Sequence, residues 1–405
     1  MHLYPSDILI PDFTSVSGKL WSVVACDQYT GEPAYWHRVE EAVGDAPSTL
    51  RLMLPEVFLG EADARVPAIH AAMRNYIENG VLHTHRRRAV WLERTQSDGR
   101  VRRGLVAAID LEEYDFSEGS ESLIRPTERT VADRIPPRIG VRRGAPLEMP
   151  HVMLLIDDPG DSVLWRFSGR AADAYDFDLM EGGGHVRGGF VGATEMQDVN
   201  AALDELAAQS TGKAPILFAV GDGNHSLATA KTVWEEYKAA GAPMTHPARY
   251  ALCETVNLHD PALEFEPIYR LAFDCDVSAL LMNFRAYAGR LCGCEAAQTF
   301  TVVTAGGCES VTVHHPEKAL PVATLQDFLD RYAESAPLGL DYIHGESAVR
   351  SLASEKGKVG FIFDGMKKNE LFRAVRLNGA LPRKTFSMGH AEDKRFYLEC
   401  RRIDG

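Results

Sequence analysis

The stretch ILFAVGDGNHSLATAKTVWEEY, residues 216–237, decides how the rest of the chain is interpreted. It begins with an apolar run typical of a buried strand, passes through Gly-Asp-Gly-Asn-His, and continues with apolar residues at helical spacing. We therefore expect a strand at 215–220, a loop at 221–224 and a helix at 225–240. A strand, a loop and a helix in this order are typical of α/β proteins.

The loop in this stretch has the composition of an anion-binding site at a helix start. Backbone N–H groups and the positive end of the helix dipole meet there, and the glycines let a ligand approach the backbone closely. The alternative is a tight turn with an asparagine cap and a surface histidine. The candidate site residues are Gly221, Gly223, Asn224 and Ser226 for ligand binding, Asp222 for catalysis and for Mg²⁺, and His225 as an acid or base.

The flanking sequence alternates strand and helix patterns, which indicates an α/β or α+β fold with mixed sheets, packed helices and two lobes. We expect a region at 1–275 that carries the loop and a C-terminal region at 276–405. The turn signal Ser97-Asp98-Gly99 predicts a hairpin there. The expected strands are 20–25, 89–92, 103–111, 152–156, 299–303, 310–313 and 360–363, and the expected helices are 33–43, 67–79, 198–209, 325–335 and 348–356.

An arginine-rich segment at 124–143 carries six arginines against two acids, in a chain whose net charge is −14. Guanidinium groups match phosphate and carboxylate through paired hydrogen bonds, so the segment is suited to close over an anionic ligand. Glu128 would then be a general base for a substrate hydroxyl. The alternative is a set of exposed ion pairs, each contributing little. The ligand-binding candidates here are Arg125, Thr127, Arg134 and Arg138.

Two further stretches allow both a functional and a structural interpretation. The arginines between residues 86 and 103 flank the predicted hairpin without interleaved aromatic residues, which favours a solvated face over a nucleic-acid site. The run 181–192 has six glycines and His185, and would form either a mobile lid over a phosphate or a flexible crossover.

Composition excludes several classes of partner. The acidic balance disfavours binding of nucleic acid or anionic membrane over the whole surface, and no apolar run approaches the ~20 residues of a membrane span. The thinly spread cysteines are typical of reduced thiols in a cytoplasm. Cys292 and Cys294 lack the spacing of a zinc ribbon. The oligomeric state is left open.

Several separate segments resemble, in the same order, motifs of the family known as domain of unknown function 1015. In this chain the loop has Asn224 where the family commonly has a histidine, Ser226 where it has an arginine, and Tyr269 stands where a histidine is usual. The segments are VVACDQYT (23–30), STLRLMLPE (48–56), IRPTERTVADR (124–134), the loop itself, EPIYR (266–270) and LPRKTFSM (381–388).

This family has no established activity to carry over. Its loop is similar to the Asp-Gly-x-x-Arg loop of the ParB/sulfiredoxin-like nucleotide-binding fold, and some members of that fold, including an ADP-dependent free-serine kinase, bind nucleotide phosphates at this helix start. The resemblance implies a central part of that type, with ATP or ADP and Mg²⁺ as cofactors.

Three functions are therefore considered. The first is a nucleotide-dependent phosphotransferase, kinase-like and acting on a small molecule, or a nucleotide hydrolase, with its phosphate site at Gly221–His225. The second is a non-catalytic sensor of a nucleotide or phosphorylated metabolite, which the changes at Asn224 and Ser226 favour. The third is a scaffold without a small ligand.

Overall fold

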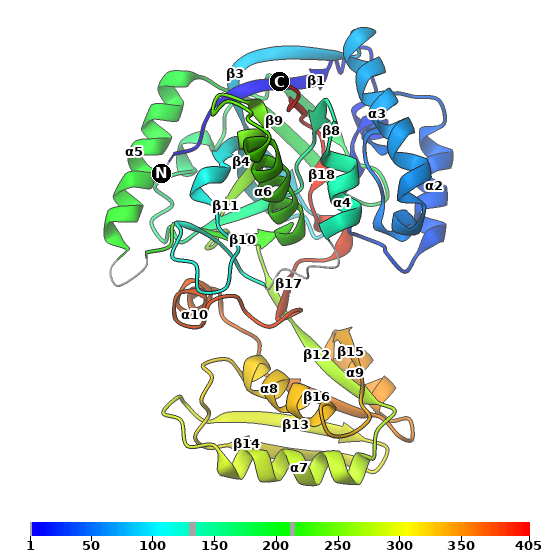
Figure 1. The fold of residues 1–405 in the computed structure, drawn as a ribbon, viewed down its shortest axis with the longest axis vertical. Coiled ribbons are helices and arrows are strands. Elements are labelled where there is room, and N and C mark those ends of the chain that lie inside the picture. Colours follow the sequence, from blue (N-terminus) through cyan, green and yellow to red (C-terminus); the bar gives the residue numbers. More distant parts are fainter. Residues whose placement is uncertain (1, 129–134, 211–214) are drawn as a thin grey trace. The chain divides into compact units, whose positions relative to one another are not determined.

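The chain has an α/β fold with mixed sheets and packed helices, as its sequence predicts (Figure 1). The computed structural model describes residues 2–128, 135–210 and 215–405. The strand, loop and helix expected around the Gly-Asp-Gly-Asn-His segment are confirmed, as strand β10 (Phe218–Asp222) and helix α6 (Asn224–Ala239).

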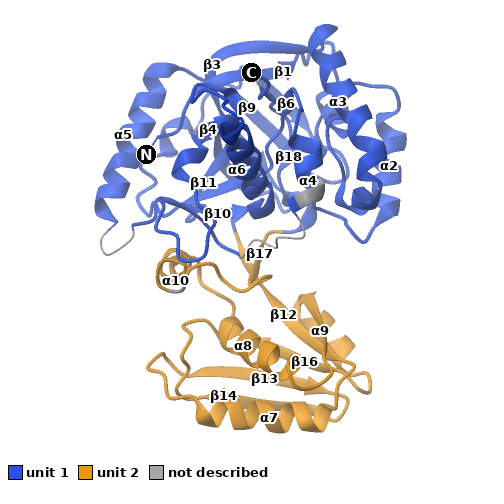
Figure 2. Ribbon diagram, in the orientation of Figure 1, with its two compact units in different colours: residues 1–263, 390–405 blue, residues 264–389 orange. Residues whose placement is uncertain are grey.

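Contacts within the chain divide it into two compact units, which Figure 2 colours separately. Unit 1 comprises residues 1–263 and 390–405, and unit 2 comprises residues 264–389. The domain boundary placed between residues 275 and 276 on sequence grounds stays a prediction, because these units are defined by contacts alone.

Unit 1 is built on a large mixed sheet. Within the described residues the strand order is β5-β10-β7-β11-β4-β3-β9-β8, and β1 pairs with β3. β5 runs parallel to β10 and β7 parallel to β11, whereas the other pairs are antiparallel. Besides β10, its strands are β1 (Ser6–Pro11), β3 (Leu82–Thr95), β4 (Val101–Asp110), β5 (Ile124–Pro126), β7 (Met153–Ile156), β8 (Tyr175–Asp178), β9 (His185–Val191) and β11 (Tyr250–Asn257).

Short elements and helices complete unit 1. Two short strand pairs involve its C-terminal segment: β2 (Val23–Val24) with β18 (Phe396–Tyr397), and β6 (Leu147–Glu148) with β19 (Arg401–Arg402). Besides α6, the described helices are α1 (Gly18–Trp21), α2 (Pro33–Val43), α3 (Ala62–Glu78), α4 (Ile135–Arg142) and α5 (Ala193–Gln209).

Most local predictions in unit 1 are confirmed, and one fails in part. The helix expected at 33–43 is α2, and the hairpin is β3 with β4. The strand expected at 20–25 is reduced to β2, because the Ser17 side chain accepts a hydrogen bond from the Leu20 N–H and starts α1 there instead.

Two apolar cores lie on opposite faces of the large sheet. Along β3, Ala89 and Trp91 belong to one core and Val90 and Leu92 to the other, because successive side chains of a strand point to opposite faces. The first core includes residues of α5 and α6, and the second includes residues of α2, α3 and β18. Helix α6 is therefore fixed against the sheet directly after β10.

The glycine-rich run 181–192 contains a strand, so the prediction of a mobile lid or flexible crossover is wrong. β9 pairs antiparallel with both β3 and β8 inside the large sheet. Gly188 and Gly189 make room for neighbouring rings, because a Cβ at these positions would lie 2.6 Å from Tyr175 Cζ and from Trp91 Nε1, respectively. The glycines serve packing within a sheet.

Unit 2 is an antiparallel sheet in the order β14-β13-β16-β12-β15, with β17 paired to β12. The strands expected at 299–303, 310–313 and 360–363 are confirmed as β13, β14 and β16. The strands are β12 (Phe265–Phe273), β13 (Gln298–Thr304), β14 (Gly307–Val313), β15 (Gly339–His344), β16 (Val359–Phe363) and β17 (Phe386–Met388), and the described helices are α7 (Val277–Arg290), α8 (Pro321–Ala333), α9 (Glu346–Ala353) and α10 (Leu371–Asn378).

Two of the sequence motifs meet inside unit 2. Arg270, at the end of EPIYR, is fully buried and donates to the backbone oxygens of Arg383 and Lys384 at 3.1 and 3.0 Å. Its Nε also donates to Gln326 Oε1 at 2.9 Å. Buried donors of this kind must be satisfied, so Arg270 holds the LPRKTFSM turn in place.

Candidate functional site

The start of α6 is held by Gly223 and by contacts to the arginine-rich segment. Gly223 has φ +78°, and a Cβ there would lie 2.9 Å from Val152 Cα, so only glycine fits this turn. Asn224 Oδ1 accepts a hydrogen bond from the Thr127 N–H at 3.2 Å, and the Thr127 hydroxyl donates to the Val220 oxygen at 2.7 Å. These contacts join the segment to the loop.

Asp222 lies at the end of β10, beside a lysine from the C-terminal segment. Its Oδ2 is 3.2 Å from Lys394 Nζ, and its Oδ1 accepts a hydrogen bond from the Gly223 N–H at 2.9 Å. Both carboxylate oxygens therefore already have partners. A divalent cation at Asp222 would have to share this carboxylate with Lys394, and Mg²⁺ binding there stays a prediction.

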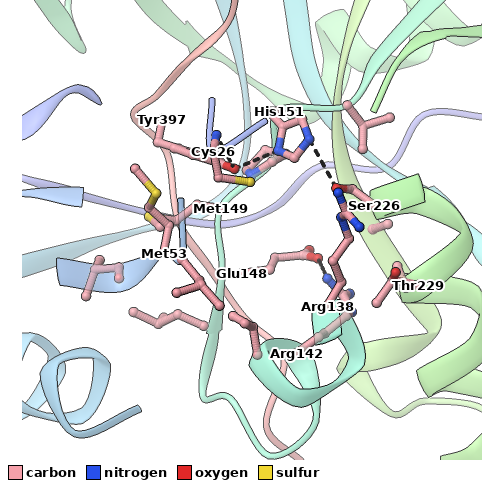
Figure 3. Close-up of a pocket in the computed structure, with 18 of the residues that line it drawn as sticks. Cys26, Met53, Arg138, Arg142, Glu148, Met149, His151, Ser226, Thr229 and Tyr397 are labelled. Carbon is pink, nitrogen blue, oxygen red and sulfur yellow. Dashed lines mark hydrogen bonds and ion pairs between the residues drawn. The ribbon is translucent and has the colours of Figure 1, made fainter. Parts of the chain in front are cut away.

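A cavity of about 130 Å³ opens between α4 and the first turns of α6 (Figure 3). Helix α6 contributes Ser226 and Thr229 to its wall, and α4 contributes Arg138 and Arg142. The remaining wall is mostly apolar and includes Leu52, Met53, Leu54, Met73, Leu147 and Met149. The cavity thus combines a polar side, near the start of α6, with an apolar side.

The two arginines of α4 are largely buried, and each is paired with a glutamate. Arg138 forms an ion pair with Glu56, and the side chains of both are 13% exposed. Arg142 Nη1 lies 2.7 Å from Glu148 Oε2, and no hydrogen-bond partner is found among the described residues for its buried Nε and Nη2 atoms. Arg142 lines the cavity, but these two nitrogen atoms are themselves covered, so a ligand would reach them only after a movement of the side chain.

His151 links the start of α6 to the C-terminal segment. Its Nε2 is 3.1 Å from Ser226 Oγ, and its Nδ1 is 2.7 Å from the Tyr397 hydroxyl (Figure 3). All three side chains line the cavity. Burial alone would raise the pKa of Asp27, but the charge of nearby His151 and the Gln28 amide outweigh it and lower that pKa. A negative charge thus lies close to the imidazole.

The residues predicted from the sequence are brought together only in part. Ser226 and Arg138 line the same cavity, which joins the loop and the arginine-rich segment in one place. His225 and Glu128 are half-buried near the loop, outside the lining of this cavity as far as the structure describes it. Arg134 lies outside the described residues.

Arg125 is turned toward backbone oxygens. It is 4% exposed, its Nε donates to the Ser122 oxygen at 2.8 Å, and its Nη2 donates to the Pro215 oxygen at 2.6 Å. These contacts strap β5 to the segment that leads into β10. Ligand binding by Arg125 stays a prediction, and its observed hydrogen bonds are structural.

Four residues of the site escaped sequence reasoning: Arg142, His151, Lys394 and Tyr397. Arg142 carried a signal, since it belongs to the same basic segment as Arg138 and lies one helical turn after it. His151 precedes a buried strand, a position at which polar residues often serve sites, but a single histidine is weak as a signal. Lys394 and Tyr397 reach the loop from the far end of the chain.

Of the arginines between residues 86 and 103, Arg86 to Arg88 are exposed, as expected of a solvated face, whereas this expectation is wrong for Arg94 and Arg102. Arg94 and Arg102 are 2% and 3% exposed. Arg102 Nη2 lies 3.3 Å from Glu254 Oε1, and Arg395 Nη1 lies 2.6 Å from Glu254 Oε2. The alternation of side chains along the hairpin strands turns these two arginines inward, toward acidic residues such as Glu254.

Three further features bear on metal sites, membrane spans and thiols. Across the described residues, His, Cys, Asp and Glu side chains do not gather in groups of three or more that would hold a metal ion. In the same part of the chain no helix is long and apolar enough to cross a membrane. All seven cysteines are free thiols.

The family model described as "Protein of unknown function (DUF1015)" matches residues 12–332. The chain belongs to this family. The resemblance found in the separate motifs is thereby confirmed, whereas the likeness to the ParB/sulfiredoxin-like fold stays a prediction. No curated protein matches the chain.

Among solved structures, this DUF1015 protein is similar to a conserved hypothetical protein from Pyrococcus furiosus, with 12% sequence identity and a TM-score of 0.37 over 74% of this chain and 95% of that chain. It is similar to a free serine kinase in complex with AMP, with 12% identity and a TM-score of 0.39 over 74% and 91%. It is also similar to a C-terminally truncated SbnI from Staphylococcus aureus, with 9% identity and a TM-score of 0.35 over 74% and 83%. Likeness at this level decides nothing about what the present chain binds.

Proposed function

We propose that this protein is a nucleotide-dependent phosphotransferase that acts on a small hydroxyl-bearing molecule, or a nucleotide hydrolase if water takes the place of that hydroxyl. The observation that carries the proposal is that Ser226, in the first turn of α6, and Arg138, on α4, line one cavity. A helix start and arginines around one space are the parts from which phosphate sites are assembled.

The hydrogen-bond donors around the cavity suit an anion. Arg138 and Arg142 extend from α4, and the peptide N–H groups of the first turn of α6 lack carbonyl partners within the helix. Arg142 in addition has donors that no described residue uses. The formal charges of Arg138 and Arg142 are matched by Glu56 and Glu148, so a phosphoryl group would be held by hydrogen bonds from the arginines and the helix start rather than by an excess of positive charge.

The size of the cavity limits what it can enclose. A volume of about 130 Å³ is close to the roughly 150 Å³ of a protein cavity that encloses benzene. It therefore suits a compact group, such as a transferred phosphoryl group or a small acceptor, and the rest of a nucleotide would extend out of it. Mg²⁺, when bound with the phosphates, would neutralise part of their charge, and Asp222 is the carboxylate at the loop that would hold it.

The roles proposed for the remaining loop residues follow from their positions. Gly223 keeps the backbone open to the ligand, and Asn224 is engaged with Thr127, so its part is to fix the loop. His225 and Glu128 are proposed as the acid and base of the transfer, close to the loop but outside the cavity. Arg134 and Arg125 would add positive charge to the same segment.

The proposal is tested by adding ATP or ADP with Mg²⁺ to the full chain and following thermal unfolding and, by phosphorus NMR, the fate of the phosphates. We expect a nucleotide-dependent rise in melting temperature and release or transfer of one phosphoryl group in the presence of hydroxyl-bearing small molecules. Unchanged melting with every nucleotide at millimolar concentration would refute the proposal.

A second candidate is a non-catalytic sensor of a nucleotide or phosphorylated metabolite. It is favoured by Asn224, which stands where the family commonly has a histidine and which is engaged with Thr127 in this structure. The sensor predicts the same rise in melting temperature without turnover, and a His225→Ala variant that binds less tightly. Phosphoryl transfer by the wild type would rule it out.

A further inference from the structure

We propose that Ser226 is a nucleophile that accepts a phosphoryl group from the bound ligand, with His151 as its general base, so that transfer passes through a phosphoserine. This deepens the function proposed above, on which it rests for the identity of the donor. It adds a covalent intermediate and assigns it to a residue that does not belong to the Gly221–His225 loop.

The first step of the argument is the hydrogen bond between the two side chains. Ser226 Oγ lies 3.1 Å from His151 Nε2, and both residues line the cavity. A nucleophile within hydrogen-bond reach of a base, which is in turn oriented by a third group, is the arrangement that activates serine hydroxyls. Figure 3 shows the third group, Tyr397, on the opposite side of the imidazole ring.

The second step assigns the tautomer of His151. Burial, together with the neighbouring Cys26, raises the pKa of Tyr397 well above its usual value. The Tyr397 oxygen accepts from the Cys26 N–H at 3.4 Å and has one lone pair left for His151 at 2.7 Å. As a general base His151 carries its proton on Nδ1, facing the Tyr397 oxygen, which leaves Nε2 free to accept the proton of Ser226; this tautomer is part of the proposal.

The third step concerns the charge that forms on His151 when it takes this proton. Asp27 lies close enough for the two charges to interact, and that interaction lowers the pKa of the Asp27 carboxyl against the opposing effect of burial. An ionised carboxylate beside the ring stabilises the imidazolium. Asp27 is thus a carboxylate near the ring, and the proposal itself stands on the contacts of His151 to Ser226 and Tyr397.

The fourth step is the position of Ser226 relative to positive charge. It is the third residue of α6, in the turn where the helix dipole favours negative charge, and it shares the cavity with Arg138 and Arg142. A phosphoryl group attached to its Oγ would remain beside these arginines. The acceptor or water that completes the reaction would enter from the same cavity.

The step balances as follows. The donor is a phosphate ester or anhydride: the Ser226 Oγ–P bond forms, the P–O bond to the leaving group breaks, and the leaving oxygen departs with that electron pair. The Ser226 proton passes to His151 Nε2 and from there to the leaving oxygen. A hydroxyl of the acceptor, or water, then attacks the phosphorus of the phosphoserine and gives its proton to His151 Nε2. The Oγ–P bond breaks, and Ser226 Oγ leaves with that electron pair and takes the proton back from His151.

The experiment exposes the full chain to ATP with Mg²⁺, ADP with Mg²⁺, or acetyl phosphate, quenches in acid and measures the intact mass and the modified peptide. We expect the mass of one phosphoryl group on Ser226 in the wild type and none in Ser226→Ala. Thr232→Ala, which changes a hydroxyl of the same helix that donates to the Ala228 oxygen at 2.9 Å and lies outside the cavity lining, is the matched control and should be labelled like the wild type.

His151→Gln should slow labelling by about 100- to 10,000-fold, the usual worth of a general base. Tyr397 is a positioning residue, and Tyr397→Phe should lower the maximal labelling rate while the half-saturating ATP concentration stays unchanged. A purely structural role of Tyr397 would lower the melting temperature without this split. Equal labelling of the wild type and His151→Gln would overturn the assignment of the base.

A second reagent, diisopropyl fluorophosphate, separates this inference from the proposed function. It phosphorylates activated serines with loss of fluoride and needs no nucleotide site. Labelling of Ser226 that depends on His151 supports the nucleophile even if no nucleotide binds, and the nucleotide proposal alone would then fall. Nucleotide turnover by Ser226→Ala at the wild-type rate, or absence of label with both kinds of reagent, overturns the nucleophile and leaves the proposed function standing on its own test.

Discussion

Unit 1 buries arginines in two places, and their surroundings differ. Around Glu254, the guanidinium groups of Arg102 and Arg395 contact its two carboxylate oxygens, and Arg395 also lies 2.6 Å from Glu399 Oε2. Around the α4–α6 cavity, Arg142 borders open space and has donors that no described residue uses. The first set joins strands to the C-terminal segment, and the second faces a space that a ligand can fill.

The difference shows why a basic residue in the sequence says little until its partners are known. In the Glu254 network each guanidinium has an acidic partner, although Arg102 Nε has no hydrogen-bond partner among the described residues, and removing the acid leaves buried charges that neither water nor protein compensates. An arginine at a cavity keeps binding capacity for an anion from outside. We therefore assign the Glu254 network to stability and the arginines of α4 to binding.

The largest effect is expected for Glu254→Gln, which leaves Arg102 and Arg395 buried with one neutral partner. The free energy of unfolding should fall by about 3–5 kcal/mol. Urea unfolding followed by circular dichroism measures it. Glu61→Gln, which breaks an exposed ion pair with Arg65, is the control and should cost less than about 1 kcal/mol. If Glu254→Gln lost as little stability as Glu61→Gln, the distinction between the Glu254 network and the cavity arginines would not hold.

Arg138→Gln tests the other side of the comparison. We expect nucleotide binding to weaken by about 1.5–3 kcal/mol, or roughly 10- to 150-fold in Kd, because a charge-assisted hydrogen bond is lost. Titration calorimetry with ATP and Mg²⁺ measures it. The control is Arg143→Gln, since Arg143 pairs with Glu236 on the surface. Equal affinities of the two variants would show that the α4 arginine does not face the ligand.

Gly223→Ala sharpens the account of the loop that meets this cavity. The added Cβ would meet Val152 Cα at 2.9 Å in a backbone conformation with φ +78°. Gly241→Ala is matched, because Gly241 has φ +92° and open space around it. We expect Gly223→Ala to lower the free energy of unfolding by about 1–2 kcal/mol more than Gly241→Ala. Both variants place alanine at a positive φ, so the difference between them measures the cost of the steric overlap with Val152 alone. Denaturant unfolding of both variants measures the difference, and equal losses would mean that the turn relaxes.

The smallest effect concerns the pH dependence of stability and Glu148. This residue pairs with Arg142 at the cavity and with the buried Arg401 of the C-terminal segment. Burial would raise its pKa, but Arg401 and Arg142 outweigh burial and lower it. A carboxyl whose pKa is lower in the folded state stabilises the fold above its unfolded value of about 4.3, and this contribution is lost as pH falls through the folded value. Between pH 6 and pH 3 the wild type should therefore lose on the order of 1 kcal/mol more than Glu148→Gln. Parallel pH profiles of unfolding would contradict the lowered pKa.

Regular periodicity made much of the fold predictable. The apolar run and helical spacing at 216–237 predict β10 and α6, and a turn signal between apolar strands predicts the hairpin of β3 and β4. α4 was missed because Pro136 and Pro137 suggest an irregular segment. Both lie in the first turn of that helix, where proline is tolerated.

The site was harder to predict because its residues come from distant parts of the chain. Ser226 and Arg138 were found, since one stands at a loop of special composition and the other in a basic segment. His151 and Tyr397 carry no motif, and only the folded chain brings their side chains within 2.7 Å. Whether a buried arginine is paired depends on partners that are distant in sequence, such as Glu254. The local sequence does not reveal which arginines are paired.

The central claim is that the cavity between α4 and α6 binds an anionic group. Its most direct test is a crystal of the full chain soaked in tungstate, whose anomalous signal locates a phosphate-like anion. The account predicts a peak inside the cavity, within hydrogen-bond distance of Ser226 and of the Arg138 guanidinium, and its loss in Arg138→Gln. Tungstate peaks on the surface with none in this cavity would contradict it.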